Sequence, residues 1–374
     1  MMRFNVFLVV FMLVVVCTNC QSTSDNNELP EREKIVMDQE GVIHGGSTAQ
    51  YVGSAGELIV IAENTVLTPE LFTFLDTTFG DYILPYYPPQ QKFELKHITP
   101  EKFQRGSRRI RNLLLIKLDE SIPAGKPKMV IKKDYFARTQ LLTEIRAHSM
   151  SDLMELLHKE VEGLVKRYEA QEWKREFYRH KKDNNQSIKN QLVKQFGITL
   201  ELPGKARFES NKNSFAKIMF PDRSRQMEMQ GSEQYSASRA NFIQSGIMIW
   251  TIPFSDSSQL SPDYLMRARD TILKYNALHE FPGVYMGTQD HPAVVPVHQR
   301  IKIGEVEGYE FRGLYKFTGR LEPSGGKFWS FHFLHPKRQV ITAISGYLDA
   351  PPTMNPAFDL RRIQAVIYSL KIAE

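Results

Sequence analysis

The sequence predicts an α+β fold, with largely antiparallel sheets flanked by helices in two sandwich-like halves. Three observations support this. Strand-like segments in 309–348 follow one another with only short turns between them, as in an antiparallel meander. Four segments place a Thr, Ser or Asn before a proline, a pattern that is typical of helix starts. The chain of 374 residues is also long enough for two domains.

The first 19 residues have the pattern of an export signal. Arg3 precedes the apolar run VFLVVFMLVVV (6–16), and polar residues follow shortly afterwards. A helix that spans a bilayer needs about 20 apolar residues, so this run is too short for a permanent span. We therefore predict a signal peptide at residues 1–19 and an exported protein.

Both cysteines of the chain, Cys17 and Cys20, lie directly behind this run. The C-x-x-C spacing can indicate a redox or metal pair, but no second Cys/His cluster completes a zinc site. Cys20 is instead similar to the acylated, palmitate-bearing cysteine of bacterial lipoproteins. Because each buried methylene contributes about 0.8 kcal/mol, two or three acyl chains would form a lasting anchor. Ordinary cleavage, which would release a soluble exported protein, is the alternative.

Residues 20–55 are polar, contain scattered Gly and Ser, and show no apolar periodicity. This composition predicts a flexible tether. A flexible coil of about 35 residues has an r.m.s. reach of about 30–35 Å, which would hold a folded body clear of the lipid headgroups.

Residues 56–197 are predicted to form an N-terminal α+β domain that ends in a long helix. GELIVIAE is a buried strand, and helices are expected to begin at Thr68-Pro69-Glu70 and at Thr99-Pro100-Glu101. Further strands are expected at 111–118, 128–133 and 140–147. Ser149 opens the long helix, whose apolar stripe repeats at helical spacing: Leu153, Leu157, Val161, Leu164 and Tyr168. The basic cluster 179–182 at its end is expected to complement the helix dipole.

Residues 198–374 are predicted to form a C-terminal α+β domain. The run SGIMIWTIPF (245–254) is nearly all apolar, as expected for a strand that is covered on both faces. A helix follows from Ser261-Pro262-Asp263, and the last helix follows Asn355-Pro356. Between them lie the meander strands 309–317, 327–333 and 338–348.

Candidate binding residues are few. Trp250, Tyr315 and Trp329 could form an aromatic platform for a sugar or peptide, although core packing is the commoner role of strand aromatics. Arg312, on the opposite face of its strand, is a further candidate, although an ordinary surface charge is the commoner role. His332 is expected at the surface. His158 and Glu162 stand four apart, but no third ligand is visible, so we predict no metal site.

Several function classes find no support in the sequence. No G-x-S-x-G elbow, H-E-x-x-H motif or phosphate-binding loop is present, so no catalytic residue and no cofactor are predicted. The net charge of +6 arises from Lys and Arg that are interleaved with Asp and Glu. A nucleic-acid-binding protein would gather its basic residues on one face, and none of that kind is predicted here.

The phrases SGIMIWTIPFSDSSQLSPDYLMRARDTILKYN, GYEFRGLYKF and IQAVIYSLK resemble a bacterial lipoprotein family, number 4837 among domains of unknown function. The resemblance extends from about Gly56 to Lys371. It implies a lipoprotein of the cell envelope, on the periplasmic or surface face of the outer membrane, and no catalytic residues. The second half also loosely resembles the PsbP-type fold, which says nothing about activity.

Two functions are compatible with these observations. The first is a lipid-anchored, non-enzymatic envelope protein that binds a protein or glycan partner or serves in assembly. This function predicts an exposed apolar patch on the protein surface, without titratable groups that converge on one point. The alternative is an envelope hydrolase or carbohydrate-processing enzyme, which expects a pocket with two carboxylates, or with a histidine and a hydroxyl.

Overall fold

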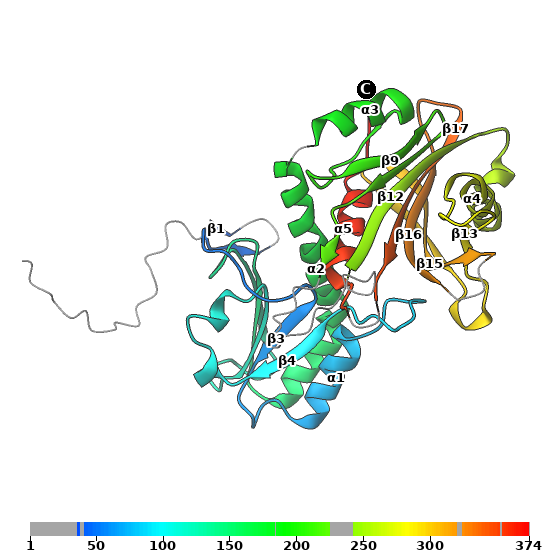
Figure 1. Cartoon of the computed structure of the whole chain (residues 1–374). Helices are drawn as coiled ribbons and strands as arrows, with labels where there is room; N and C mark the ends of the chain where they lie inside the picture. The colour runs from blue at the N-terminus through cyan, green and yellow to red at the C-terminus, as the bar shows by residue number, and fades with distance from the viewer. Residues whose placement is uncertain are drawn as a thin grey trace, which may run out of the picture.

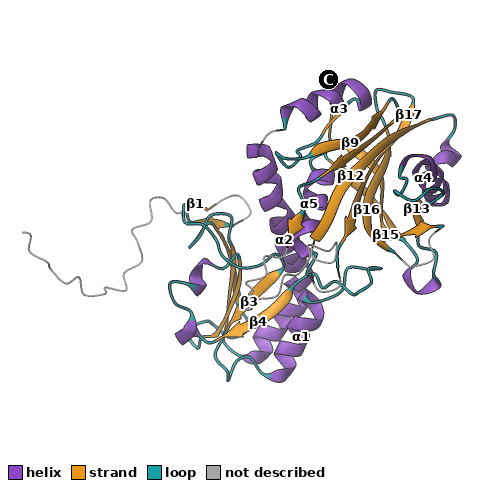
Figure 2. Ribbon diagram, viewed as in Figure 1, coloured by secondary structure: helices purple, strands orange, loops and turns teal. Residues whose placement is uncertain are grey.

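The computed structural model describes residues 36–37, 41–183, 185–224, 242–319, 324–351 and 354–373. The predicted signal peptide, Cys17, Cys20 and most of the predicted tether lie outside these residues. The predicted α+β class is confirmed: one sheet forms in the N-terminal part and a second sheet in the C-terminal part, and the long helix α2 (Met150–Asp183) runs between them (Figures 1 and 2).

The N-terminal sheet has seven strands. Their order in the sheet is β1 (Val36–Met37), β2 (Ile43–His44), β6 (Lys128–Lys133), β7 (Leu141–Ala147), β5 (Asn112–Leu118), β3 (Glu57–Ile61) and β4 (Glu94–Ile98). The pairs β2–β6, β7–β5, β5–β3 and β3–β4 are parallel, which the sequence analysis did not predict. The strands β3 and β5 are largely apolar, but so is the antiparallel strand β12 (Phe242–Pro253), so an apolar run alone does not reveal the direction of its neighbours.

Helix α1 (Pro69–Phe79) lies in the crossover between the parallel strands β3 and β4, as such a connection requires. It begins as predicted, because the Thr68 hydroxyl accepts a hydrogen bond from the Leu71 N–H at 3.3 Å. The predicted stripe of α2 is buried against α1 and the sheet. Helix α2 follows Ser149, whose hydroxyl accepts from the Asp152 N–H at 3.2 Å.

The predicted helix at Thr99-Pro100 is wrong. The chain there forms only a three-residue 3₁₀ turn at Pro100–Lys102, because no amphipathic repeat follows that could pack against the core. Other 3₁₀ turns lie at Ser107–Arg109, Ser257–Leu260 and Pro292–Val294. The helix α3 (Gln186–Phe196), which was not predicted, follows α2 and ends at Gly197, where φ is +67°.

The C-terminal sheet is antiparallel throughout its described strands. Its order is β13 (Tyr285–Thr288), β15 (Val306–Thr318), β16 (Gly325–Leu334), β17 (Val340–Asp349), β12 (Phe242–Pro253), β10 (Phe215–Met219) and β9 (Arg207–Lys212). Two more strands pair beside this path, β11 (Arg223–Ser224) with β12 and β14 (Val297–Ile303) with β15. The short strands β8 (Ile198–Thr199) and β18 (Lys371–Ile372) pair with each other.

Helices cover both faces of the C-terminal sheet. Helix α4 (Pro262–Asn276) packs on one face through Leu265 and Leu273. Helix α5 (Ala357–Tyr368) packs on the other face, where Gly346 lets Ile363 approach: a Cβ at Gly346 would lie 2.1 Å from the Ile363 Cγ2. No helix in the described part of the chain combines the length and the apolar character needed to cross a membrane.

A buried ion cluster ties α2 to the N-terminal sheet. The Glu172 carboxylate accepts hydrogen bonds from Arg111 at 2.8 and 3.0 Å, from Asn112 at 2.6 Å, from Arg175 at 2.5 Å and from the Gly56 N–H at 3.2 Å. Burial raises the pKa of Glu172, but the guanidiniums of Arg175 and Arg111 outweigh it, so the pKa lies below its ordinary value. Glu172 is therefore ionised and fully hydrogen-bonded.

Replacing Glu172 by Ala should lower the free energy of unfolding by about 3–5 kcal/mol, because two arginines would remain buried without their counter-ion. Urea denaturation of the purified protein measures this. The control is Glu155→Ala, at an exposed position of the same helix, which should change stability by no more than about 0.5 kcal/mol. Equal effects of the two substitutions would contradict a structural role for the cluster.

Candidate functional site

A cavity of about 410 Å³ lies where the second half of α2 meets α5; we call it the α2–α5 cavity. Figure 1 shows these two helices side by side. The cavity is lined by four α2 residues, by two α5 residues and by two loops of the C-terminal part: Glu176, Arg179, His180, Asp183, Phe358, Arg362, Pro203, Gly204, Lys205 and Pro221.

Three polar atoms at this cavity are buried without a hydrogen-bond partner among the described residues. They are Glu176 Oε1, His180 Nδ1 and Arg362 Nε. Glu176 and His180 are each 1% exposed, and Arg362 is 6% exposed. Buried polar groups in proteins are nearly always hydrogen-bonded, so three unpartnered atoms around one cavity require an explanation.

The other polar atoms of these side chains are held in place. Glu176 Oε2 accepts from Arg179 Nη1 at 2.9 Å. Arg362 Nη2 donates to the Ser245 hydroxyl at 2.5 Å, and Arg362 also forms an ion pair with Asp359 at 3.2 Å. These side chains are thus oriented by the protein, and each keeps one buried polar atom without a partner among the described residues.

Burial controls the ionisation of this group. It raises the pKa of Glu176, although Arg179 opposes the shift. Burial, followed by the charges of Arg362 and Arg179, lowers the pKa of His180 to about 3. A hydrogen bond with the Glu201 backbone opposes this lowering of the pKa, and Nδ1 is the ring nitrogen without a partner. At neutral pH the imidazole is therefore uncharged.

The contrast with the neighbouring ion cluster separates two roles for buried charge on α2. Every oxygen of Glu172 has partners, so that cluster stabilises the fold. Glu176 lies one turn further along the same face and keeps a free oxygen. The α2–α5 cavity is therefore the best candidate for a binding site.

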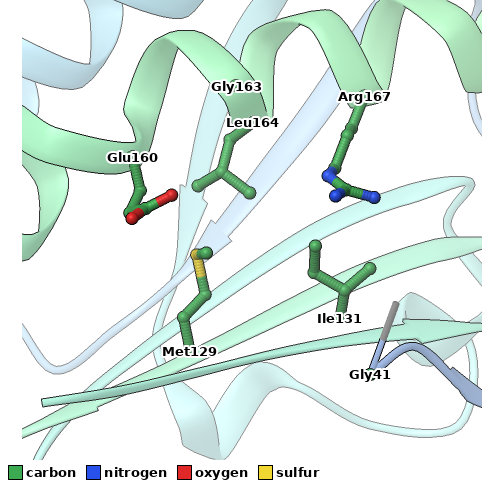
Figure 3. Close-up of a pocket in the computed structure, with 7 residues that line it drawn as sticks. All are labelled: Gly41, Met129, Ile131, Glu160, Gly163, Leu164 and Arg167. Carbon is green, nitrogen blue, oxygen red and sulfur yellow. The ribbon is translucent and has the colours of Figure 1, made fainter. Parts of the chain in front are cut away.

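A second hollow, of about 240 Å³, lies between α2 and β6 (Figure 3). Its floor is apolar: Leu164 points from the helix towards Met129 and Ile131 on the strand. Glu160 and Arg167 flank it from the helix. None of its lining residues has a buried polar side-chain atom without a partner, so this hollow shows no sign of a specific ligand.

The structure does not bring the aromatic candidates together on one surface. Trp250 and Tyr315 are buried on the α4 face of the C-terminal sheet. Trp329 is buried on the α5 face, where the Arg312 guanidinium lies 5.3 Å from its ring centroid. The three aromatic residues therefore belong to two core layers, and Arg312 is partly exposed beside Trp329. Cys20 lies outside the described residues.

The expectation of a surface His332 is wrong. It is 2% exposed because α4 covers its face of the sheet, and burial lowers its pKa to about 3. His180 is likewise buried rather than part of an exposed basic cap. His158 and Glu162 are exposed, and the described residues contain no group of three or more His, Cys, Asp or Glu side chains that could hold a metal ion.

Sequence reasoning missed Glu176 and His180, although a signal was present. The apolar stripe of α2 ends at Tyr168, but the same helical phase continues through Glu172, Glu176 and His180 at intervals of four residues. Polar residues in phase with a buried stripe indicate a buried polar surface.

Comparisons with known families divide the chain in two. Residues 185–369 match the model of a domain of unknown function, DUF4837. Residues 52–181 match a different one, DUF8532, also a domain of unknown function. The resemblance to DUF4837 was expected from Gly56 onwards, and the match corrects this extent: it covers only the C-terminal part.

Similar solved structures are distant. A mutant form of protein Mog1 and the Saccharomyces cerevisiae Ran-binding protein Mog1p each show 11% identity and a TM-score of 0.28. They match 48% of this chain, over 92% and 91% of their own length. A protein from Bacteroides thetaiotaomicron shows 8% identity, a TM-score of 0.24 and coverage of 48% and 46%. Such scores support no inference about function. No curated protein matches the sequence.

Acid should destabilise the protein partly through His180. Below about pH 6.5 the unfolded chain binds a proton at this histidine, whereas the folded chain does not until about pH 3. The free energy of unfolding therefore falls by about 1.4 kcal/mol per pH unit, through His180 alone, as the pH is lowered from about 6.5 to about 3. His180→Gln should flatten the curve of unfolding free energy against pH by that amount, measured with urea between pH 6 and 4.

His332→Gln should flatten the same curve independently, since its pKa is also lowered to about 3 and it lies on the other side of the C-terminal sheet. The raised pKa of Glu176 changes the free energy of unfolding with pH in the opposite direction. Glu176 is present in both the wild type and the His180 variant, so the comparison of the two curves isolates His180. A His180→Gln curve parallel to that of the wild type would contradict a neutral, buried His180.

Proposed function

We propose that the protein is a lipid-anchored protein of the cell envelope that binds a hydroxyl-rich ligand, a glycan, in the α2–α5 cavity. The observation that carries the proposal is that Glu176, His180 and Arg362 line one cavity and that each has a buried polar atom without a partner in the described structure. Each hydroxyl of a sugar offers both a donor and acceptors. Neighbouring hydroxyls could therefore satisfy the carboxylate, the imidazole and the guanidinium together.

Binding is favoured over hydrolysis by the composition of the cavity. Two carboxylates line it, the number that the hydrolase alternative expects, but only Glu176 is buried, whereas Asp183 is exposed at the helix end. No Ser, Thr or Cys is among those lining residues, so the described cavity offers no hydroxyl or thiol nucleophile. The titratable groups were not expected for a binding protein, but each has a role in holding a polar ligand.

The anchor is proposed on the sequence alone. Cys20 follows the apolar run 6–16 and an intervening Cys-Thr-Asn, and the tether that follows is polar. Acyl chains on Cys20 would hold the protein on a membrane of the envelope, for which we propose the outer membrane. The resemblance of the C-terminal part to a lipoprotein family supports this placement.

Cys20→Ala should release the protein from the membrane fraction into the soluble fraction, because the acyl chains would have no attachment site. Cell fractionation and immunoblotting measure the distribution. Cys17→Ala is the matched control and should leave the protein with the membrane. If both variants fractionate like the wild type, acylation at Cys20 is refuted.

Glycan binding can be tested with an array of bacterial envelope glycans and the purified protein. The wild type should bind a subset of them, and Glu176→Gln should weaken that binding at least about 10-fold, since a hydrogen bond to a charged group is lost. Glu155→Gln, at an exposed position of the same helix, should bind normally. Normal binding by Glu176→Gln, or no bound glycan, would refute the proposal, and cleavage of a glycan over time would indicate the hydrolase instead.

A further inference from the structure

A second cavity, of about 600 Å³, lies on the other side of the first turn of α5. Phe358 and Arg362 of this helix line the α2–α5 cavity, whereas Asn355, Pro356 and Ala357 line the second one. The loop between α1 and β4 forms the opposite wall, and Lys327 of β16 contributes the one basic side chain. We call this the Lys327 cavity.

Lys327 is a buried cation without a counter-ion. It is 8% exposed, and no described residue forms an ion pair or a hydrogen bond with its ammonium group. Its Nζ lies over the Tyr86 ring, 6.0 Å from the ring centroid. Burial lowers its pKa. Buried lysines are normally paired, because a charge taken out of water is costly unless another group compensates it.

The N-terminus of α5 adds positive potential to the same cavity. The first N–H groups of a helix lack intrahelical acceptors and carry a partial positive charge, which favours anions. The Ala357 N–H is already capped by the Asn355 side chain at 2.8 Å, so the helix end adds only its partial charge and Lys327 supplies the full positive charge of this cavity. Asp359, the acid in the first turn, instead contacts Arg223 and Arg362 on the side of the other cavity.

The negative side chain at this cavity does not neutralise Lys327. Glu94 lines the cavity, but its side chain is 57% exposed and forms an ion pair with Lys96 at 3.5 Å. Much of the remaining wall is apolar or aromatic: Tyr82, Pro88, Pro89, Pro351, Met354 and Pro356. The cavity thus combines a single ammonium and a helix N-terminus with a wall that suits a ring.

We propose that the Lys327 cavity binds an organic carboxylate with an apolar or aromatic body. The carboxylate lies between Lys327 and the first turn of α5, and the body packs on the proline and tyrosine wall. One ammonium balances the single charge of a carboxylate, whereas a phosphate dianion would leave an unpaired negative charge in the cavity. The site is distinct from the proposed glycan site.

Benzoate is the probe, and benzamide, which has the same shape without the charge, is its control. We expect isothermal titration at pH 7 to detect binding of benzoate but not of benzamide. Lys327→Met, which keeps the length of the side chain, should weaken benzoate binding at least about 10-fold, because the charge that pairs with the carboxylate is lost. Lys302→Met, at an exposed position of β14, should bind like the wild type. A crystal soaked with 4-iodobenzoate should show the iodine signal within the Lys327 cavity.

Three results would overturn this inference: benzoate binding that Lys327→Met leaves intact, no benzoate binding by the wild type, or a preference for inorganic phosphate. Lys327→Met should also raise the melting temperature, because it removes an unpaired buried charge. A lowered melting temperature would assign Lys327 a structural role instead. Glu176→Gln should bind benzoate normally, so failure of the proposed glycan site and failure of this site can be told apart.

Discussion

The structure depends on a single buried carboxylate, Glu172, and on the two arginines that surround it. Its oxygens accept from Arg111 and Asn112 at the start of β5, from Gly56 just before β3, and from Arg175 on its own helix. Two parallel strands and α2 are therefore fixed at one point. A charge in this position is tolerated only because all its hydrogen-bonding capacity is used. The cluster sets the direction in which α2 leaves the N-terminal sheet, and so where its second half meets α5.

The same face of α2 changes its character along its length. Up to Tyr168 this face is apolar and packs on the N-terminal sheet. At Glu172 and Arg175 it is charged, and all its polar atoms have hydrogen-bond partners. At Glu176 and His180 it is again polar, but one atom of each side chain has no partner among the described residues. A folded chain gains nothing in stability from the last arrangement, since each unpartnered buried atom keeps its desolvation cost. Such costs persist where a ligand offsets them, and this is the physical basis for assigning a site to the α2–α5 cavity.

Helix α5 connects the features of the C-terminal part. It packs closely on β17 because Gly346 has no side chain, and its first turn separates the two cavities. Asp359 neutralises the arginines on one side of that turn, whereas the other side retains the helix dipole and Lys327. The first turn of α5 thus lies between two chemically different cavities. One is polar, with Glu176 and His180 of α2 and Arg362 of α5, and the other is largely apolar, with Lys327 of β16 as its single cation.

The sequence by itself determined the α+β class, the start of α1, the length and apolar stripe of α2 and the antiparallel meander, because these follow from local capping and periodicity. It also indicated the similarity of the C-terminal part to a domain of unknown function. Only the tertiary structure decided that the N-terminal strands pair in parallel, that His332 is covered by α4, and that Glu176, His180 and Arg362 meet. Arg362 lies 182 positions beyond His180, and no local pattern records which distant helix will cover a face. Burial of a polar side chain is a property of its neighbours in space, and those neighbours are set by how whole elements pack.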